Sequence, residues 1–285
     1  ATMAERTESI DIGSSILNTY SRSPALLGQT AATLQELSEG RFRLGLGPSG
    51  PVVVENWHGV EYGNPLKRTR ETVEVVRQVL SGDPVDYDGD EFELSGFRLR
   101  CDPPETTPPI EVTGMGPKAV ELAGRFADGW HGIMLTPEGI ETRLEDIERG
   151  AALGDRDSDD VRVTAGVTCC VLDDPQEARA LARQHVAFYI GGMGTFYRDS
   201  LERQGYDEAA DIYDAWQAGD RERALELVDE DILDDLCAVG DPETAREQLA
   251  RYEAIDGLDA IAVSFPRGAD EAGVRRTMDA VAPDA

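Results

Sequence analysis

Apolar and polar positions along this chain follow two alternating periods, which together predict parallel strands separated by helices. Short apolar runs, several of them rich in β-branched residues, predict strands at residues 10–17, 41–47, 109–113, 129–135, 161–172 and 258–265. Longer segments with apolar residues three or four positions apart predict helices at residues 24–39, 65–80, 118–126, 137–153, 174–189, 242–254 and 270–281. This alternation is typical of a parallel α/β fold.

The first strand–helix–strand unit, residues 10–50, ends both of its strands in small residues. Pro24 suits the first position of the helix, and Gly40 suits its end. The helix has an apolar stripe at Leu26, Leu27, Thr30, Leu34 and Leu37. Because strands joined by a helix run parallel, residues 14–20 and 45–50 should meet at the carboxyl edge of the sheet, where ligands of α/β folds bind.

Four further segments complete the predicted organisation. Residues 1–9 resemble the end of a helix, and residues 51–64 read as a loop. Short alternating runs between residues 82 and 99 predict a small excursion that covers a barrel mouth. Residues 194–236 predict several amphipathic helices without a strand. We expect one domain, 1–285, with a helical insertion at about 191–240.

The charge of the chain is strongly negative. Acidic residues number 56 against 27 basic ones, for a formal charge of −29, and Lys67 and Lys118 are the only lysines. A basic nucleic-acid-binding face is therefore not expected. A dispersed, lysine-poor acidic surface favours a halophile, since salt screens its self-repulsion. An ordinary acidic cytosolic protein is the alternative.

Cysteine and histidine positions argue against a metal site. Cys101, Cys169, Cys170 and Cys237 form no CxxC pair, and the three histidines, His58, His131 and His185, show no metal-ligand spacing. We expect reduced and mostly buried thiols. No GxSxG elbow supports serine hydrolysis. No signal peptide or spanning apolar run is evident, which predicts a cytoplasmic protein without membrane contact.

Three segments carry a resemblance to the luciferase-like flavin and deazaflavin oxidoreductases. They are IGSSILNTYSRSP (12–24), AATLQELSEGRFRLGLG (31–47) and PPIEVTGMGPKAVELAGRFADGW (108–130). The first looks most like the branch that uses coenzyme F420, a deazaflavin, typified by methylenetetrahydromethanopterin reductase. With the acidic composition, this suggests a haloarchaeal protein. The match covers most of the chain, weakly between about 191 and 241.

The resemblance implies a TIM-type (β/α)8 barrel. A closed barrel needs eight strands, and the sequence predicts six. The family normally begins with two more βα units, and this chain starts where the helix before the third strand would end. We therefore expect either that an N-terminal portion is missing or that the barrel is shortened.

The resemblance also implies a set of cofactor-binding residues. Ser14, Ser15 and Ile16 would form a bulge with a non-prolyl cis peptide behind the middle of the cofactor ring; the alternative is a plain strand with small residues for packing. Gly114, Met115, Gly116, Pro117 and Lys118 would bind the cofactor phosphate. They form a glycine turn before a helix N-terminus, where free N–H groups and the helix dipole favour an anion. The alternative is a tight turn.

The end of the second strand, residues 45–49, would border the ring and the substrate, with Gly47 and Pro48 as contacts; a simple loop is equally compatible. Some relatives have a catalytic Glu directly after this strand. Pro48 and Ser49 stand there instead, which argues against such an acid or base.

Four more side chains are candidates with open alternatives. Asn18, Tyr20 and Arg22 are plausible contacts of the cofactor, although a solvent-facing loop explains them equally well. His131 could face the pocket, but a core or surface position is favoured. The sequence identifies no catalytic residue.

The function that this resemblance implies is hydride transfer between coenzyme F420 and an organic small-molecule substrate. An FMN-dependent luciferase-like monooxygenase is one alternative. A non-catalytic flavin-binding protein with a shortened barrel is another. We also expect a homo-oligomer, either a dimer or a tetramer.

Overall fold

The computed structural model describes residues 1–283, which divide into two compact units. Unit 1 comprises residues 1–130 and 146–162. Unit 2 comprises residues 131–145 and the chain from residue 163 onward. Both units contain parallel strands connected through helices.

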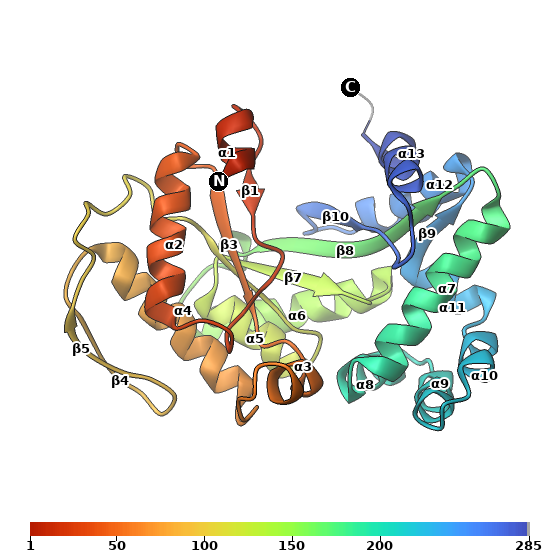
Figure 1. Cartoon of the computed structure of the whole chain (residues 1–285), viewed down its shortest axis with the longest axis horizontal. Helices are drawn as coiled ribbons and strands as arrows, with labels where there is room; N and C mark the ends of the chain where they lie inside the picture. The colour runs from red at the N-terminus through yellow and green to blue at the C-terminus, as the bar shows by residue number, and fades with distance from the viewer. Residues whose placement is uncertain (284–285) are drawn as a thin grey trace. The chain divides into compact units, whose positions relative to one another are not determined.

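Unit 1 is built on a parallel sheet with helices packed on it (Figure 1). Its strands are β1 (Ile12–Gly13), β2 (Leu17–Asn18), β3 (Phe42–Gly47), β6 (Ile110–Thr113) and the first residues of β7 (Gly129–Ile133). β3 lies between β6 on one side and both β1 and β2 on the other. Its helices are α1 (Thr2–Arg6), α2 (Pro24–Leu37), α3 (Pro51–Asn56), α4 (Pro65–Ser81), α5 (Pro117–Phe126), the later part of α6 (Pro137–Leu153) and the 3-10 turn η1 (Ser158–Asp160).

The predicted single strand at residues 10–17 is wrong, because the chain is interrupted between β1 and β2. Gly13 pairs with Arg43, whereas Leu17 pairs with Leu46. The first chain thus advances four residues while β3 advances three, which leaves one extra residue in a bulge. Ser15, inside this bulge, is exposed. The bulge that the resemblance implies is therefore present.

Local signals place α2 correctly, but its buried face differs from the predicted leucine stripe. The Ser23 hydroxyl accepts the Leu26 N–H at the start of α2, and Gly40 has a φ of +89° beyond its end. Leu26 and Leu37 are 47% and 37% exposed. Gly28 instead faces α4, where an added Cβ would lie 2.6 Å from a Val79 methyl carbon. Small residues let the two helices approach closely, so they decide which face is buried.

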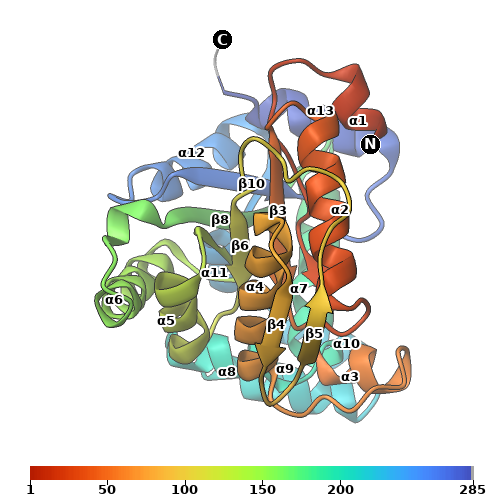
Figure 2. The same ribbon diagram turned by 90° about the vertical axis from the view of Figure 1, so that its left-hand side faces the viewer.

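The excursion predicted at residues 82–99 is an antiparallel hairpin. β4 (Val85–Asp88) pairs with β5 (Glu93–Phe97). The hairpin lies beside α4 (Figure 2). Its expected place over a barrel mouth stays a prediction.

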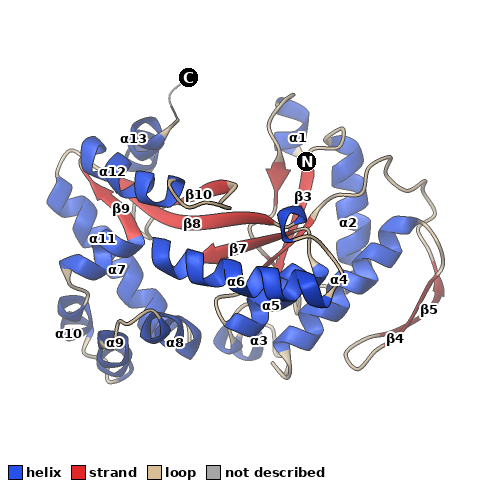
Figure 3. Ribbon diagram, turned by 180° about the vertical axis from the view of Figure 1, so that it is seen from behind, coloured by secondary structure: helices blue, strands red, loops and turns tan. Residues whose placement is uncertain are grey.

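Unit 2 places its longest strand, β8 (Arg162–Val171), between two shorter parallel strands, β9 (Cys237–Gly240) and β10 (Ala260–Ser264). Helices α7 and α12 pack on β9 (Figure 3). The helices of this unit are the early part of α6, α7 (Pro175–Gly192), α8 (Thr195–Arg203), α9 (Glu208–Gln217), α10 (Arg221–Leu227), α11 (Glu230–Leu236), α12 (Pro242–Glu253) and α13 (Glu271–Val281).

Two short elements were not predicted. β9 falls at the end of the segment expected to be helical, so the insertion at about 191–240 is not entirely helical. It directly follows α11 without a turn residue, and only its pairing with β8 identifies it as a strand. α3 lies inside the predicted loop at 51–64. Its three consecutive valines have low helix propensity, which hid the helix despite Pro51 at its start.

Candidate functional site

The bulge between β1 and β2 is held against β3 by one serine. The peptide bond between Ser15 and Ile16 is cis, as the resemblance implied. The Ser14 hydroxyl accepts the Gly45 N–H at 3.0 Å and donates to the Gly45 carbonyl at 3.1 Å. A Cβ added to Gly45 would lie 2.1 Å from the Ser14 carbonyl oxygen. Gly45 is therefore required for the close approach of the bulge to β3.

The carboxyl ends of neighbouring strands converge at Gly47. A Cβ at this position would lie 2.5 Å from a methyl carbon of Thr113 and 3.0 Å from one of Ile16. The structure thus brings the bulge, the end of β3 and the end of β6 together. This packing explains the glycine by itself, so contact of Gly47 and Pro48 with a cofactor stays a prediction.

The turn between β6 and α5 contains two glycines with different environments. A Cβ at Gly114 would lie 2.4 Å from the Ala119 Cβ, and the Gly114 carbonyl accepts the Trp130 indole N–H at 2.8 Å. Packing therefore requires Gly114. At Gly116 a Cβ would meet nothing within 4 Å, and φ is −83°. The space above the turn is therefore open, and neither packing nor backbone conformation requires glycine at this position.

Several backbone N–H groups at the start of α5 have no hydrogen-bond acceptor among the described residues. Gly116 is its N-cap and supplies no side-chain cap. The backbone N–H groups of Met115, Gly116 and Lys118 donate to no other described residue. Unpaired N–H groups at a helix start favour an anion.

The Lys118 side chain does not contribute to this group of free donors, because it is paired with Glu121. Its side chain is 75% exposed, and its ammonium group donates to both Glu121 carboxylate oxygens, at 3.1 and 2.9 Å. Its charge is therefore already paired one turn further along α5. A direct contact with a phosphate would require it to exchange partners.

The loop after β2 differs from the expected solvent-facing one. Tyr20 is buried, stacks on Tyr62 with ring centroids 5.4 Å apart, and donates its hydroxyl to the Tyr62 carbonyl. Burial raises the pKa of Tyr20 to about 12, although the Arg68 cation acts in the opposite direction. Tyr20 thus stays a protonated structural donor near neutral pH and does not face solvent, while contact of its side chain with a cofactor stays a prediction. The Tyr62 hydroxyl in turn donates to the Ser49 carbonyl at 2.9 Å.

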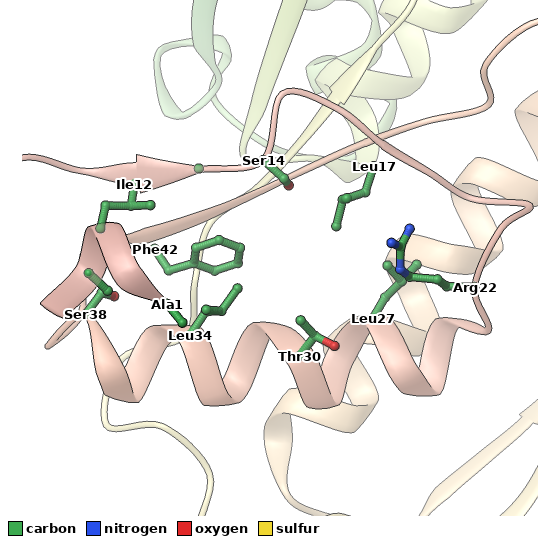
Figure 4. A pocket seen from close by; sticks show the side chains of 12 residues that line it. Ala1, Ile12, Ser14, Leu17, Arg22, Leu27, Thr30, Leu34, Ser38 and Phe42 are labelled. Atoms are coloured by element: carbon green, nitrogen blue, oxygen red, sulfur yellow. The ribbon is translucent and has the colours of Figure 1, made fainter.

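A cavity of about 270 Å³ in unit 1 lies away from most of the predicted site (Figure 4). Its walls are mainly apolar side chains of α2 and the strands, such as Leu27, Leu34 and Phe42, with Arg22 at its rim. Of the residues predicted to contact the cofactor it includes Ser14 and Arg22. The cavity belongs to the layer between α2 and the sheet and offers few polar groups for a cofactor.

The remaining candidates are placed as follows. His131 is buried in β7, which excludes the surface position among the expected alternatives. Three of the four cysteines are buried, and all four are free. Within residues 1–283, no His, Cys, Asp and Glu cluster could hold a metal ion. In the same range, no helix is both long and apolar enough to cross a bilayer.

Sequence reasoning missed Thr113 and Arg68. Thr113 contacts the site through Gly47, and Arg68 contacts the loop after β2 through the Thr19 carbonyl. Neither has a local sequence signal, because each acts on a segment distant in the chain.

Comparison with known proteins identifies the family to which this chain belongs. Residues 1–257 match the luciferase-like monooxygenase family, and the chain belongs to it. Among individual proteins, it is 34% identical over 270 residues to a putative coenzyme F420-dependent oxidoreductase of Mycobacterium tuberculosis, covering 87% of this chain and 77% of that protein. It is 31% identical to the 5,10-methylenetetrahydromethanopterin reductase of Archaeoglobus fulgidus, covering 94% and 81%.

A solved structure confirms the fold class. The coenzyme F420-dependent tetrahydromethanopterin reductase of Methanopyrus kandleri superimposes with a TM-score of 0.81 at 27% identity, covering 98% of this chain and 83% of that one. The predicted TIM-type α/β barrel class is therefore confirmed.

Proposed function

We propose that this protein is an oxidoreductase that transfers a hydride between coenzyme F420 and an organic small-molecule substrate. The relatives at 34% and 31% identity are named a putative coenzyme F420-dependent oxidoreductase and a 5,10-methylenetetrahydromethanopterin reductase. The observation in the structure that carries the proposal is the open turn at the start of α5. Its donors are unpaired and Gly116 is in open space.

The residues present fit a deazaflavin or flavin with a phosphate. The N–H groups of Met115, Gly116 and Lys118 would bind the phosphate, assisted by the helix dipole. The bulge at residues 14–16 would support the ring, and Gly47 with Pro48 would border it. The bound cofactor supplies the hydride chemistry, while the protein orients it and excludes water.

Replacement of Gly116 by Val tests the phosphate site. Because a Cβ there meets no protein atom, the Gly116→Val variant should melt close to the parent. Its branched side chain would fill the space above the turn, so the Kd for the cofactor should rise at least about tenfold, as for the loss of a charge-assisted hydrogen bond. Lys118→Ala should weaken binding less, because the ammonium group is already paired with Glu121.

Both variants and the parent are titrated with F420 and with FMN, followed by absorbance. Binding of FMN in place of F420 would support the luciferase-like monooxygenase alternative. A folded Gly116→Val variant that binds the cofactor as tightly as the parent would show that this turn does not bind the cofactor phosphate. A parent that binds neither cofactor would refute the proposed function.

Three further proposals concern the origin, the compartment and the oligomeric state of the protein. The charge of −29 and the two lysines support a protein adapted to high salt, and thereby a haloarchaeal origin. Four free cysteines, three of them buried, support a reducing compartment such as the cytoplasm. A homo-oligomer, dimer or tetramer, stays a prediction that light scattering can test.

A further inference from the structure

The buried indole of Trp130 holds the first peptide group of the turn before α5. Trp130 belongs to β7, and none of its surface is exposed. Its Nε1–H donates to the Gly114 carbonyl at 2.8 Å. Because the ring is enclosed and a buried N–H needs an acceptor, the indole cannot turn away from this carbonyl without losing its hydrogen bond. A side chain further along the chain therefore fixes the direction in which the Gly114 carbonyl points.

The start of β7, which carries Trp130, is itself anchored. The Asp128 carboxylate accepts the Ile110 backbone N–H at 2.8 Å and pairs with Arg77 at 2.8 Å. The Asp128 backbone N–H donates to the Ile110 carbonyl at 2.7 Å. These bonds tie the start of β7 to the start of β6, the strand that leads into the turn. The indole and the turn are thus held by the same pair of strands.

One peptide group of the turn contains both the fixed carbonyl and a free donor. The Gly114 carbonyl and the Met115 N–H belong to the same peptide unit, and among the described residues the cis peptide bond is at Ser15–Ile16. In a trans peptide the C=O and the N–H point in opposite directions. The indole that accepts no other direction of the carbonyl therefore directs the Met115 N–H away from the Trp130 ring. That N–H has no acceptor among the described residues, and the neighbouring Gly116 borders open space.

We propose that Trp130 is a positioning residue for the cofactor phosphate, which it orients through the peptide group between Gly114 and Met115. This inference rests on the proposed function. The indole fixes the direction of the Met115 N–H, and it also polarises the peptide group, since hydrogen bonds in a chain strengthen one another. Because its ring is fully buried, Trp130 does not reach the ligand and acts through the turn alone.

Two substitutions of Trp130 separate the N–H donor from the packing of the ring. Phe keeps an aromatic ring without a donor, whereas His loses more of the ring but keeps an N–H that can take the place of the indole Nε1–H. Trp130→Phe should weaken binding of the phosphorylated cofactor about three- to tenfold, the range of one neutral hydrogen bond. Trp130→His should retain most of this affinity, although its larger packing loss should lower the melting temperature at least as far.

Paired ligands with and without a phosphate show whether the loss is specific. FMN is paired with riboflavin, which lacks only the phosphate, and F420 is paired with its deazaflavin core. Absorbance titrations give the Kd of each ligand, and the ratio within a pair measures the phosphate preference. Trp130→Phe should reduce this preference and leave the Kd of the unphosphorylated ligand unchanged, whereas a merely structural role would raise both Kd values. Trp216→Phe, which removes an indole from α9 in unit 2, is the matched control and should change neither Kd.

The parent protein provides a test that needs no change at Trp130. The chain has three tryptophans, so NMR of an isotope-labelled sample gives three indole N–H signals, which Trp57→Phe and Trp216→Phe assign. The Trp130 signal should shift more with the phosphorylated ligand than with its unphosphorylated partner, because the phosphate binds the other end of the same peptide group. This measurement decides the inference even if a Trp130 variant does not fold.

The outcomes separate the inference from the function on which it rests. Three results would overturn the inference alone: a Trp130→Phe variant with the phosphate preference of the parent, a folded Trp130→His variant that loses as much preference as Trp130→Phe, or a Trp130 signal that does not distinguish the paired ligands. A parent that binds both members of a pair equally would refute the phosphate site in this turn and the inference with it. A parent that binds neither cofactor would refute the proposed function as well.

Discussion

His185 should make the stability of this protein fall between neutral and mildly acidic pH. The ring is buried in α7, and its Nδ1 accepts the Arg267 backbone N–H at 3.2 Å. Burial, assisted by the nearby Arg267 cation, lowers the pKa of His185 from 6.5 to about 4. An Nδ1 that accepts this hydrogen bond carries no proton, so the folded protein favours the neutral ring.

The sign and size of the effect follow from proton linkage. Between pH 6.5 and pH 4 the unfolded chain binds a proton at His185 that the folded chain does not, so stability falls as the pH falls through this window. At 1.36 kcal/mol for each pKa unit, the loss amounts to about 2 kcal/mol at pH 5 and about 3 kcal/mol at pH 4.

The His185→Asn variant separates this titration from every other group. Asn keeps an acceptor for the Arg267 N–H but does not titrate, and its packing loss is independent of pH. The free energy of unfolding is measured with urea for parent and variant at neutral pH and at pH 5, in molar potassium chloride to screen surface charge. The advantage of the parent should shrink by about 2 kcal/mol at the lower pH. A difference that stays constant would show that the fold does not hold His185 neutral.

Two further predictions test the site and the surface. Gly45→Ala places a Cβ 2.1 Å from the Ser14 carbonyl oxygen, so it should lower the free energy of urea unfolding by more than about 2 kcal/mol, whereas Gly116→Ala, in open space, should change it little. Equal effects of the two substitutions would contradict the packing argument. The charge of −29 predicts a higher melting temperature in molar potassium chloride than in dilute buffer, and a temperature that is flat or falls with salt would remove the proposal of salt adaptation.

The sequence alone determined the elements whose signals are local. Pro24 and Gly40 mark α2, and α6 begins and ends where its pattern predicted. Asp241 accepts two N–H groups at the start of α12, as an N-cap should. These features depend on residues within a few positions of one another, so a single chain is enough to read them. The bulge at Ser14–Ile16 came instead from family resemblance.

Tertiary structure decided what depends on distant segments. The strand β9 exists because β8 pairs with it, and the buried face of α2 was selected by the approach of α4. Arg68 packs on the Phe92 ring in a hairpin turn whose backbone N–H groups donate to the Glu71 carboxylate.

The glycines show the division most clearly. Gly45 lies within β3 and Gly116 lies in the turn after β6, and the sequence alone gives no reason to treat the two glycines differently. Only the folded chain shows that Gly45 faces the Ser14 carbonyl, while Gly116 faces open space. The reason is physical: a side chain is excluded by atoms that lie close in space, and those atoms come from parts of the chain that local sequence does not specify.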